Sequence, residues 1–240
     1  MAILLDDSVG DGQFLNVEEA VVTAVPFTMH CWFNSDDISK DQYVVSIGDA
    51  SATNHFVGIQ LRGASDDKVA VLMLAGGGVL TAVSSNAYLA NTWYPATAVC
   101  AAANDRKIYF NGEAGVISST PATMTGIDQT TIGRSADYSP FGECSGMLAE
   151  VAIWDVALTD WECQQLAIGF SPKCLTSKLP HLKLYKSLRR FINDPDDVGP
   201  GMQAWSNDAL TTAAMPSFSN HPPTIIDPPV VATRLLPVLA

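Results

Sequence analysis

Glu150 and Asp155 are the two carboxylates whose spacing suggests chemistry, because Trp154 stands beside them as an aromatic contact for a ligand. A retaining glycosidase needs two carboxyl groups about 5–5.5 Å apart, one acting as nucleophile and one as acid/base. Residues 147–156 alternate as a β-strand does, so a spacing of five turns the two carboxylates to opposite faces. The sequence therefore argues against a glycanase site here.

The other reactive side chains do not form a known catalytic arrangement. No G-x-S-x-G elbow is present, and the five cysteines contain no CxxC pair. The histidines are scattered without HExxH spacing: His30, His55, His181 and His221. An acidic turn of Asp6, Asp7 and Asp11 lacks the spacing of an EF-hand, so a solvated turn is favoured over a calcium loop. We predict a protein that is not an enzyme and has no cofactor, with calcium kept as an alternative.

Tyr138 and Phe141 are the aromatic residues best placed to contact a partner, because they lie in a long loop rich in Ser, Gly and Pro. The tryptophans fall within or beside predicted strands, where packing is the favoured role: Trp32, Trp93, Trp154 and Trp205. His30 lies in the alternating run 27–33 and is expected to be a structural histidine rather than a base.

Short apolar runs between turn residues predict about twelve strands, at the roughly 8–12-residue spacing typical of an antiparallel sandwich. Residues 55–61 and 69–74 flank a Gly/Asp-rich turn and are expected to form a hairpin. Asn111-Gly112 supplies the positive φ values of a type I′ hairpin turn. Pro95 lies early in the predicted strand of residues 93–101 and suggests that this is an edge strand or contains a bulge.

Residues 130–169 are expected to fold as strand, loop, strand and capped helix. Thr159 and Glu162 match the T-x-x-E capping box, and Gly169 is suited to end the helix. The order IGR…AEVAIWD-x-ALT-x-x-E…LA-x-G resembles the closing segment of laminin-G-like, concanavalin A-like jelly-roll domains. The opening residues 2–17 and the IYFNGE hairpin resemble the same family.

This resemblance implies an all-β fold, a two-sheet antiparallel jelly-roll sandwich with one short helix. A glycanase of this family carries E-x-D-x-x-E on one strand, whereas this chain has E-V-A-I-W-D, with Ala152 where a middle carboxylate would stand. Such sandwiches serve as lectins, adhesion modules, glycanases and virion proteins alike, so the fold implied here does not decide the function.

Charge is distributed unevenly along the 240 residues, whose formal net charge is −12. Residues 1–170 hold 20 acidic and 6 basic residues (−14), and residues 171–240 hold 5 and 7 (+2). The acidic total argues against nucleic-acid binding. Six of the basic residues fall between Lys173 and Arg190 with no acid among them. We expect this basic strip to dock on the chain's own domain, with an acidic neighbour second and a phosphate partner third.

Three segments are expected. Residues 1–170 form the sandwich, 171–215 form a basic connector and a returning strand packed on it, and 216–240 form an extended, proline-rich C-terminal arm. The arm holds six of the fourteen prolines. A jelly-roll followed by the order L…Y-x-x-L…D…G…L…HPP resembles phage and prophage proteins of unassigned function. In this chain that order is met by Leu184, Tyr185, Leu188, Asp197, Gly199, Leu210, His221, Pro222 and Pro223. The candidate interface residues are Tyr138, Phe141, Pro222, Pro223, Ile225, Ile226, Leu235 and Leu236.

The favoured interpretation is a structural virion protein, such as a phage capsid decoration or cement protein. It would bind the major capsid protein, or further copies of itself as a homo-oligomer, through its loops and its arm. No signal peptide or membrane span is evident, so synthesis in a host cytoplasm and residence in the virion are expected. The alternative is a carbohydrate-binding or adhesion module that uses loops 35–41 and 135–143, with or without calcium. A cellular scaffold domain is the third interpretation.

Overall fold

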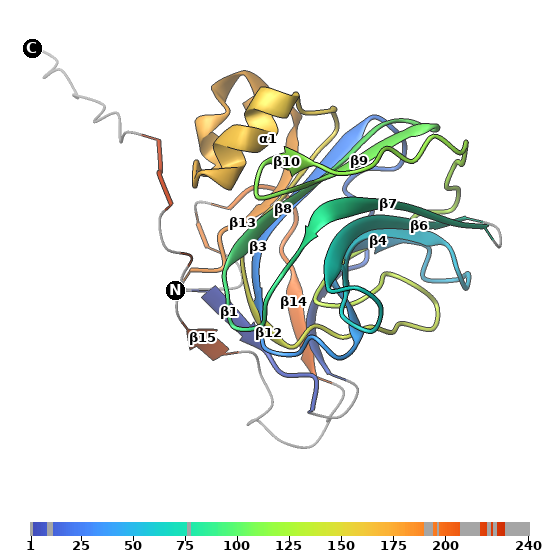
Figure 1. Cartoon of the computed structure of the whole chain (residues 1–240), viewed down its shortest axis with the longest axis horizontal. Helices are drawn as coiled ribbons and strands as arrows, with labels where there is room; N and C mark the ends of the chain where they lie inside the picture. The colour runs from blue at the N-terminus through green and yellow to red at the C-terminus, as the bar shows by residue number, and fades with distance from the viewer. Residues whose placement is uncertain are drawn as a thin grey trace, which may run out of the picture.

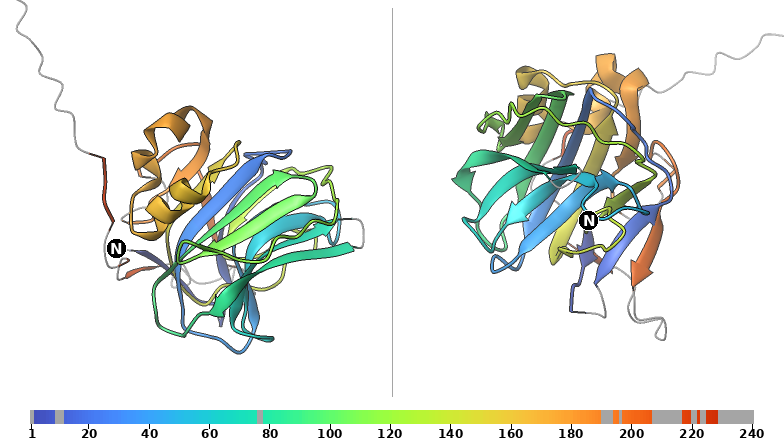
Figure 2. Two further views of the ribbon diagram at one scale, coloured as in Figure 1. Left: turned by 45° about the horizontal axis from the view of Figure 1, so that its top comes forward. Right: turned by 90° about the vertical axis from the view of Figure 1, so that its right-hand side faces the viewer.

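The computed structural model of the chain describes residues 2–8, 12–75, 78–189, 194–195, 197–206, 217–219, 222 and 225–228. Two antiparallel β-sheets face each other as a sandwich, with a short helix at one end (Figures 1 and 2). This confirms the predicted all-β jelly-roll class. The described residues contain no helix of the length and apolar character that a membrane span requires.

The first sheet, sheet A, has the strand order β10-β9-β8-β3-β12-β1-β15, and β13 also pairs with β12. Its strands are β1 (Ala2–Leu5), β3 (Phe27–Ser35), β8 (Tyr94–Ala102), β9 (Asp105–Phe110), β10 (Glu113–Ala114), β12 (Gly146–Trp154), β13 (Leu182–Lys186) and β15 (Ser217–Ser219). Strands β1 and β13 divide one edge of β12 between them, because β1 pairs with its first half and β13 with its second half.

The second sheet, sheet B, has the order β14-β2-β11-β4-β5-β6-β7. Its strands are β2 (Gln13–Val17), β4 (Asp41–Gly48), β5 (Phe56–Arg62), β6 (Lys68–Ala75), β7 (Gly78–Ala87), β11 (Gln129–Ile132) and β14 (Gln203–Ser206). The predicted hairpin is confirmed as β5 and β6, which pair from Phe56↔Leu74 to Arg62↔Lys68.

The core lies between the sheets and follows the alternation of the strands. The inward side chains of β3 and β5 belong to one buried cluster: Phe27, Met29, Cys31, Phe33, Val57, Ile59 and Leu61. Each fully buried apolar side chain of this size contributes about 1.5–3 kcal/mol to folding. His30, which lies between Met29 and Cys31, faces the other side of β3 and is also fully buried.

Strand β12 differs from the prediction, because a β-bulge between Ala149 and Ala152 interrupts its alternation. Leu148 and Val151 both belong to the central core, although strict alternation would put them on opposite faces. Glu150 lies in the bulge with a φ of +54°, a left-handed conformation that few non-glycine residues adopt. The prediction of one regular strand face is therefore wrong from Glu150 onward.

Helix α1 (Asp160–Ala167) begins as predicted. The Thr159 side chain accepts from the Glu162 backbone N–H, and the Glu162 carboxylate accepts from the Thr159 N–H at 2.8 Å. Helix α1 lies beside sheet A (Figure 1). Its Cys163 and Leu166 pack with Trp154 in a buried cluster outside the central core. Two 3₁₀ helices follow, η1 (Pro172–Cys174) and η2 (Thr176–His181).

Pro95 marks neither an edge nor a bulge, so that prediction is wrong: β8 lies between β3 and β9, and its register shift falls between Cys100 and Ala102. The Pro95 carbonyl accepts from the Asn111 N–H, so the proline nitrogen points to the same side of the strand. Pairing between β8 and β9 starts only at Ala96↔Phe110. The missing N–H therefore falls at the end of the β8–β9 ladder, outside its paired residues. The Asn111-Gly112 turn is confirmed, with φ of +52° and +78°.

The basic strip docks on the chain's own acidic body, as predicted. Lys178 pairs with Glu162 at 3.6 Å, and Lys183 pairs with Asp155 at 2.8 Å. The deeper cations also have acidic partners within the chain: Lys186 with Asp197 at 3.6 Å and Arg189 with Glu150 at 2.9 Å. These ion pairs use the strip for intramolecular contacts. The division into three segments stays a prediction, although β13, β14 and β15 each extend a sheet.

Candidate functional site

The loop of residues 133–145 crosses the outer face of sheet B. The Arg134 guanidinium lies over the Phe14 ring, 3.3 Å from its centroid, and the Ala136 carbonyl rests on Gly48. A side chain at Gly142 would meet the Tyr43 ring at 2.7 Å, and its φ of +67° also favours glycine. Close approaches to β2 and β4 therefore position this loop.

Phe141 and Tyr138 present aromatic surface from this loop, with exposed fractions of 42% and 65%. The Phe141 ring makes edge-to-face contacts with Tyr43 at 5.5 Å and Phe56 at 5.7 Å, and these two rings lie 5.1 Å apart. The Tyr138 N–H donates to the Ala52 carbonyl at 3.3 Å. These contacts hold the Phe141 ring and the Tyr138 backbone in place. The two exposed side chains are called the aromatic platform below.

The second loop, residues 35–41, lies against the first. The Asp36 N–H donates to the Ser145 carbonyl at 3.3 Å. Gln42 joins the two loops, because its amide nitrogen donates to the Ser35 hydroxyl at 3.0 Å and its oxygen accepts from the Ser145 N–H at 2.7 Å. The structure thus brings together the two loops that the sequence had linked only by composition. Gln42, which is fully buried, was missed because nothing local marks such a contact.

The acidic side chains of these loops mostly organise turns. Asp37 accepts from the backbone and hydroxyl of Ser39 at 2.7 and 2.6 Å, and Asp137 accepts from the Asn54 N–H at 2.9 Å. At the other acidic turn, hydrogen bonds from the Ser8 hydroxyl and N–H lower the pKa of Asp6. Among the described residues, no three His, Cys, Asp or Glu side chains are grouped to hold a metal ion. Calcium therefore stays a prediction.

Tyr43 and Gln60 provide polar groups beneath the platform. Burial raises the pKa of the Tyr43 phenol, so the hydroxyl stays neutral at physiological pH. The Gln60 amide nitrogen donates to Asp41 at 3.0 Å, while its buried oxygen has no partner in the described part of the chain. These groups lie on the same outer face of sheet B as Phe56.

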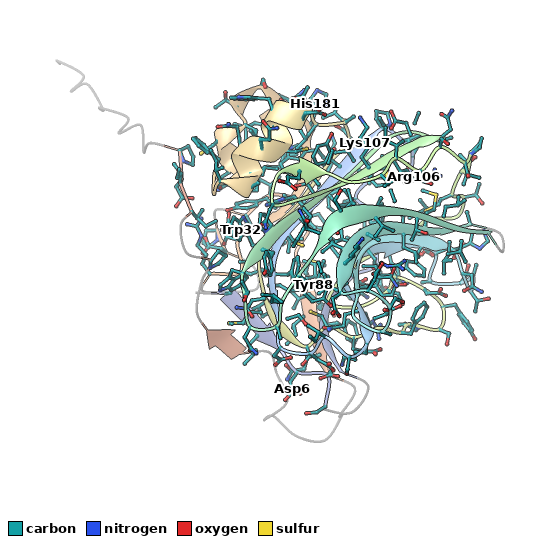
Figure 3. All side chains as sticks on the ribbon, in the orientation of Figure 1. Asp6, Trp32, Tyr88, Arg106, Lys107 and His181 are labelled. Atoms are coloured by element: carbon teal, nitrogen blue, oxygen red, sulfur yellow. The ribbon has the colours of Figure 1, made fainter. Side chains whose placement is uncertain are left out.

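Glu150 and Asp155 lie in different environments. Glu150 is fully buried and accepts from the Tyr185 hydroxyl at 2.8 Å and from Arg189 at 2.9 Å. Asp155 lies just beyond β12 and pairs with His181, labelled in Figure 3, and Lys183, both at 2.8 Å. Both carboxylates serve ion pairs within the fold, and the buried Glu150 is closed to solvent.

The arm residues chosen from the sequence lie partly against the chain itself. Pro222 is buried, and Ile225 packs against Ala2, Trp32 and Ala149. Ile226 forms a parallel bridge with Phe170 and keeps 40% of its surface exposed. Pro223, Leu235 and Leu236 lie outside the described residues. An interface role for this set stays a prediction.

The tryptophans pack as expected where they are described. Trp154 is fully buried, Trp32 is 7% exposed, and Trp93 packs partly buried against the Trp32 cluster. The Trp205 side chain is outside the described part. Trp161, on α1, is 62% exposed.

The family model for the concanavalin A-like lectin/glucanases superfamily matches residues 9–164. No curated protein sequence matches the chain. Solved structures are similar in fold. One is a Bacteroides ovatus protein provisionally described as carbohydrate binding, with 20% identity, a TM-score of 0.54, and coverage of 87% of this chain and 60% of the other.

Two further structures come from sialidases. The CBM40 domain of the Ruminococcus gnavus IT-sialidase, bound to α2,3 sialyllactose, has 14% identity and a TM-score of 0.53, covering 60% of this chain and 84% of the domain. The NanB sialidase of Streptococcus pneumoniae has 14% identity and a TM-score of 0.51, covering 63% of this chain and 27% of that enzyme. At these identities the similarity shows a shared fold.

Proposed function

The chain belongs to the concanavalin A-like lectin/glucanase superfamily, and we propose that it is a non-catalytic module that binds carbohydrate. The contact surface is the platform of Tyr138 and Phe141 on loop 133–145, together with the adjoining loop 35–41. The single observation that carries the proposal is that both aromatic side chains are exposed while the loop beneath them is anchored to Tyr43, Phe56 and Gly48.

Aromatic side chains suit a sugar ring because they offer a large apolar face at little conformational cost. Tyrosine adds a hydroxyl that can exchange hydrogen bonds with the ligand. The similarity in fold to carbohydrate-binding domains favours a glycan over a peptide as the ligand of this platform. A rigid apolar platform with polar groups nearby is also the usual composition of a small-molecule site.

The virion interpretation now ranks second. Besides the missing catalytic set, the missing export signal and the charge asymmetry, it rested on an arm that would be costly to leave in water. In that arm Ile225 packs on sheet A, and Ile226 forms backbone hydrogen bonds with Gly169 and Ser171. The structures named above are a carbohydrate-binding candidate and parts of sialidases, and none of them is a virion protein. We therefore place glycan recognition ahead of capsid decoration.

The proposal predicts glycan binding that depends on Tyr138. On a glycan array, the chain should bind at least one glycan class, and Tyr138→Ala should weaken that binding by roughly two- to tenfold, since an aromatic contact contributes about 0.5–1.5 kcal/mol. Phe141→Ala should have a similar effect. The matched control is Trp161→Ala, which removes an aromatic side chain of similar exposure (62%, against 65% for Tyr138) on α1 and should leave binding unchanged.

The array should be repeated with a chelator to test the calcium alternative. Binding that survives chelation assigns recognition to protein side chains, and binding that is lost assigns it to a bound ion. A chain that binds no glycan, or a Tyr138→Ala variant that binds as well as the unaltered chain, contradicts the proposal.

A further inference from the structure

A polar hollow lies at the edge of sheet B, where β14 begins beside β2. It is lined by Asn16, Val17, Glu18, Gly201 and Gln203 and has a volume of about 150 Å³. A water molecule takes about 30 Å³ in the liquid, and drug-sized ligands occupy roughly 300–1,000 Å³. The hollow therefore has room for one small ligand unit.

The strand alternation of β2 explains why polar groups meet here. Leu15 and Val17 point to the core between the sheets. Asn16 therefore projects from the outer face, and Glu18 follows directly after the strand. Gln203 of β14 pairs directly with Asn16, so the two amide side chains are neighbours on this face. Gly201, two residues before Gln203, has no side chain and leaves the space beside Glu18 open.

Asn16 is incompletely satisfied. Its side-chain oxygen is buried and has no hydrogen-bond partner among the described residues. An unpaired buried acceptor costs about 1–3 kcal/mol. Rotation about χ2, which is soft in asparagine, can turn this oxygen toward the hollow. A ligand hydroxyl donating there would supply the missing partner.

The chemistry of the lining selects the ligand. The two amides can donate to and accept from hydroxyl groups, and the carboxylate can accept from them, as adjacent hydroxyls on a sugar require. Glu18 is the one charged residue in the lining, so an anionic sugar would be repelled. Arg134, the cation of the crossing loop, lies over the Phe14 ring and is not part of this lining.

We propose that Asn16, Glu18 and Gln203 form a second carbohydrate subsite, which takes one neutral sugar unit through its hydroxyls. For its ligand class this inference rests on the proposed function, but it uses different residues. The subsite and the aromatic platform share the outer face of sheet B. The strands β2 and β4, which carry Asn16 and Tyr43, are separated by β11 alone, so these two strands lie about 10 Å apart in the strand-pairing direction. One oligosaccharide can therefore reach both.

The test uses the full chain, labelled with ¹⁵N, and three neutral probes: methyl glucoside, methyl galactoside and methyl mannoside. At least one of them should shift the side-chain amide signals of Asn16 and Gln203. Asn16→Ala should weaken that binding about tenfold. Glu18→Gln, an exposed and nearly isosteric change, should weaken it several-fold. The matched control is Glu19→Gln, which removes the same charge one residue outside the hollow and should change nothing.

N-acetylneuraminic acid serves as the acidic probe and should leave the wild-type signals unmoved. The subsite is overturned if no neutral probe shifts these amides, if Glu18→Gln behaves like Glu19→Gln, or if calcium chloride alone produces the same shifts. Array binding that depends on Tyr138, with silent Asn16 and Gln203 signals, leaves the proposed function standing and removes the subsite. If the probes shift these amide signals but array binding does not depend on Tyr138, the subsite stands and the aromatic platform is removed as the proposed site.

Discussion

Replacing Arg189 with alanine is expected to lower the free energy of unfolding by about 3 kcal/mol, the lower end of what breaking a buried ion pair costs. Its Nε donates to Glu150 at 2.9 Å, and its two terminal nitrogens donate to the Asp227 carboxylate at 2.6 and 2.9 Å. The Glu150 side chain is fully buried, whereas that of Arg189 is 28% exposed. Without the guanidinium, a carboxylate closed to solvent loses a close cation.

The same substitution should loosen the C-terminal segment, because Arg189 joins it to the bulge of β12. Asp227 is held by Arg189, and the Ile226 carbonyl accepts from the Ser171 N–H at 2.9 Å. With the Arg189 contact removed, the backbone bonds of Ile226 would retain the segment more weakly. We expect faster proteolytic cleavage near residues 225–228 in Arg189→Ala than in the unaltered chain.

Urea unfolding checks the stability effect, with Lys183→Ala as the matched control. Lys183 also pairs with a carboxylate, Asp155, at 2.8 Å, but the two side chains are 39% and 37% exposed. Exposed pairs contribute about 0–1 kcal/mol, so this variant should lose little. Glu150→Gln should reduce the cost of Arg189→Ala, since the charge that needs the guanidinium is gone. Equal losses in Arg189→Ala and Lys183→Ala would contradict the buried role of Glu150.

Acid is expected to destabilise the protein through His30 by roughly 4 kcal/mol between pH 7 and pH 3. His30 is fully buried, with Nδ1 2.9 Å from the Thr97 hydroxyl. Burial lowers its pKa from 6.5 to about 3. Below pH 6.5 the unfolded chain takes up a proton that the folded chain refuses. The stabilisation is therefore complete above the unfolded pKa and is lost as the pH falls.

Unfolding free energies measured by urea at pH 7.5, 5.5 and 4.5 test this effect. His30→Gln removes the titrating group, so its loss of stability per pH unit should be smaller than that of the unaltered chain by about 1.4 kcal/mol. Thr97→Val is the control, because it keeps the buried imidazole and should keep the steeper pH dependence. Parallel curves for the unaltered chain and His30→Gln would rule out His30 as the source.

The sequence alone was sufficient for the fold class. The strand alternation of residues 27–33, the Asn111-Gly112 turn and the Thr159–Glu162 capping box each depend on neighbours within a few residues, and all three are present. The resemblance to concanavalin A-like domains agrees with the family match over residues 9–164. Local periodicity and turn chemistry determine these features, because their hydrogen bonds close within one element.

The site was only partly predictable. Tyr138 and Phe141 could be chosen because they lie in a long loop, yet their support comes from Tyr43 and Phe56, about a hundred residues earlier in the chain. The strand prediction for residues 147–156 failed at Glu150, since tertiary contacts with Tyr185 and Arg189 hold the bulge. The Asn16–Gln203 pair was not predicted at all, because its register depends on which strand reaches the edge of sheet B.

Residue pattern by itself thus determined a two-sheet sandwich, a capped helix and an exposed aromatic loop. Tertiary structure alone decided which loops meet, which charges are buried and where the polar hollow opens. The physical reason is the range of the interactions: alternation and capping act between near neighbours, whereas Gln42–Ser145, Arg189–Asp227 and Asn16–Gln203 join residues that only the completed sheets bring together.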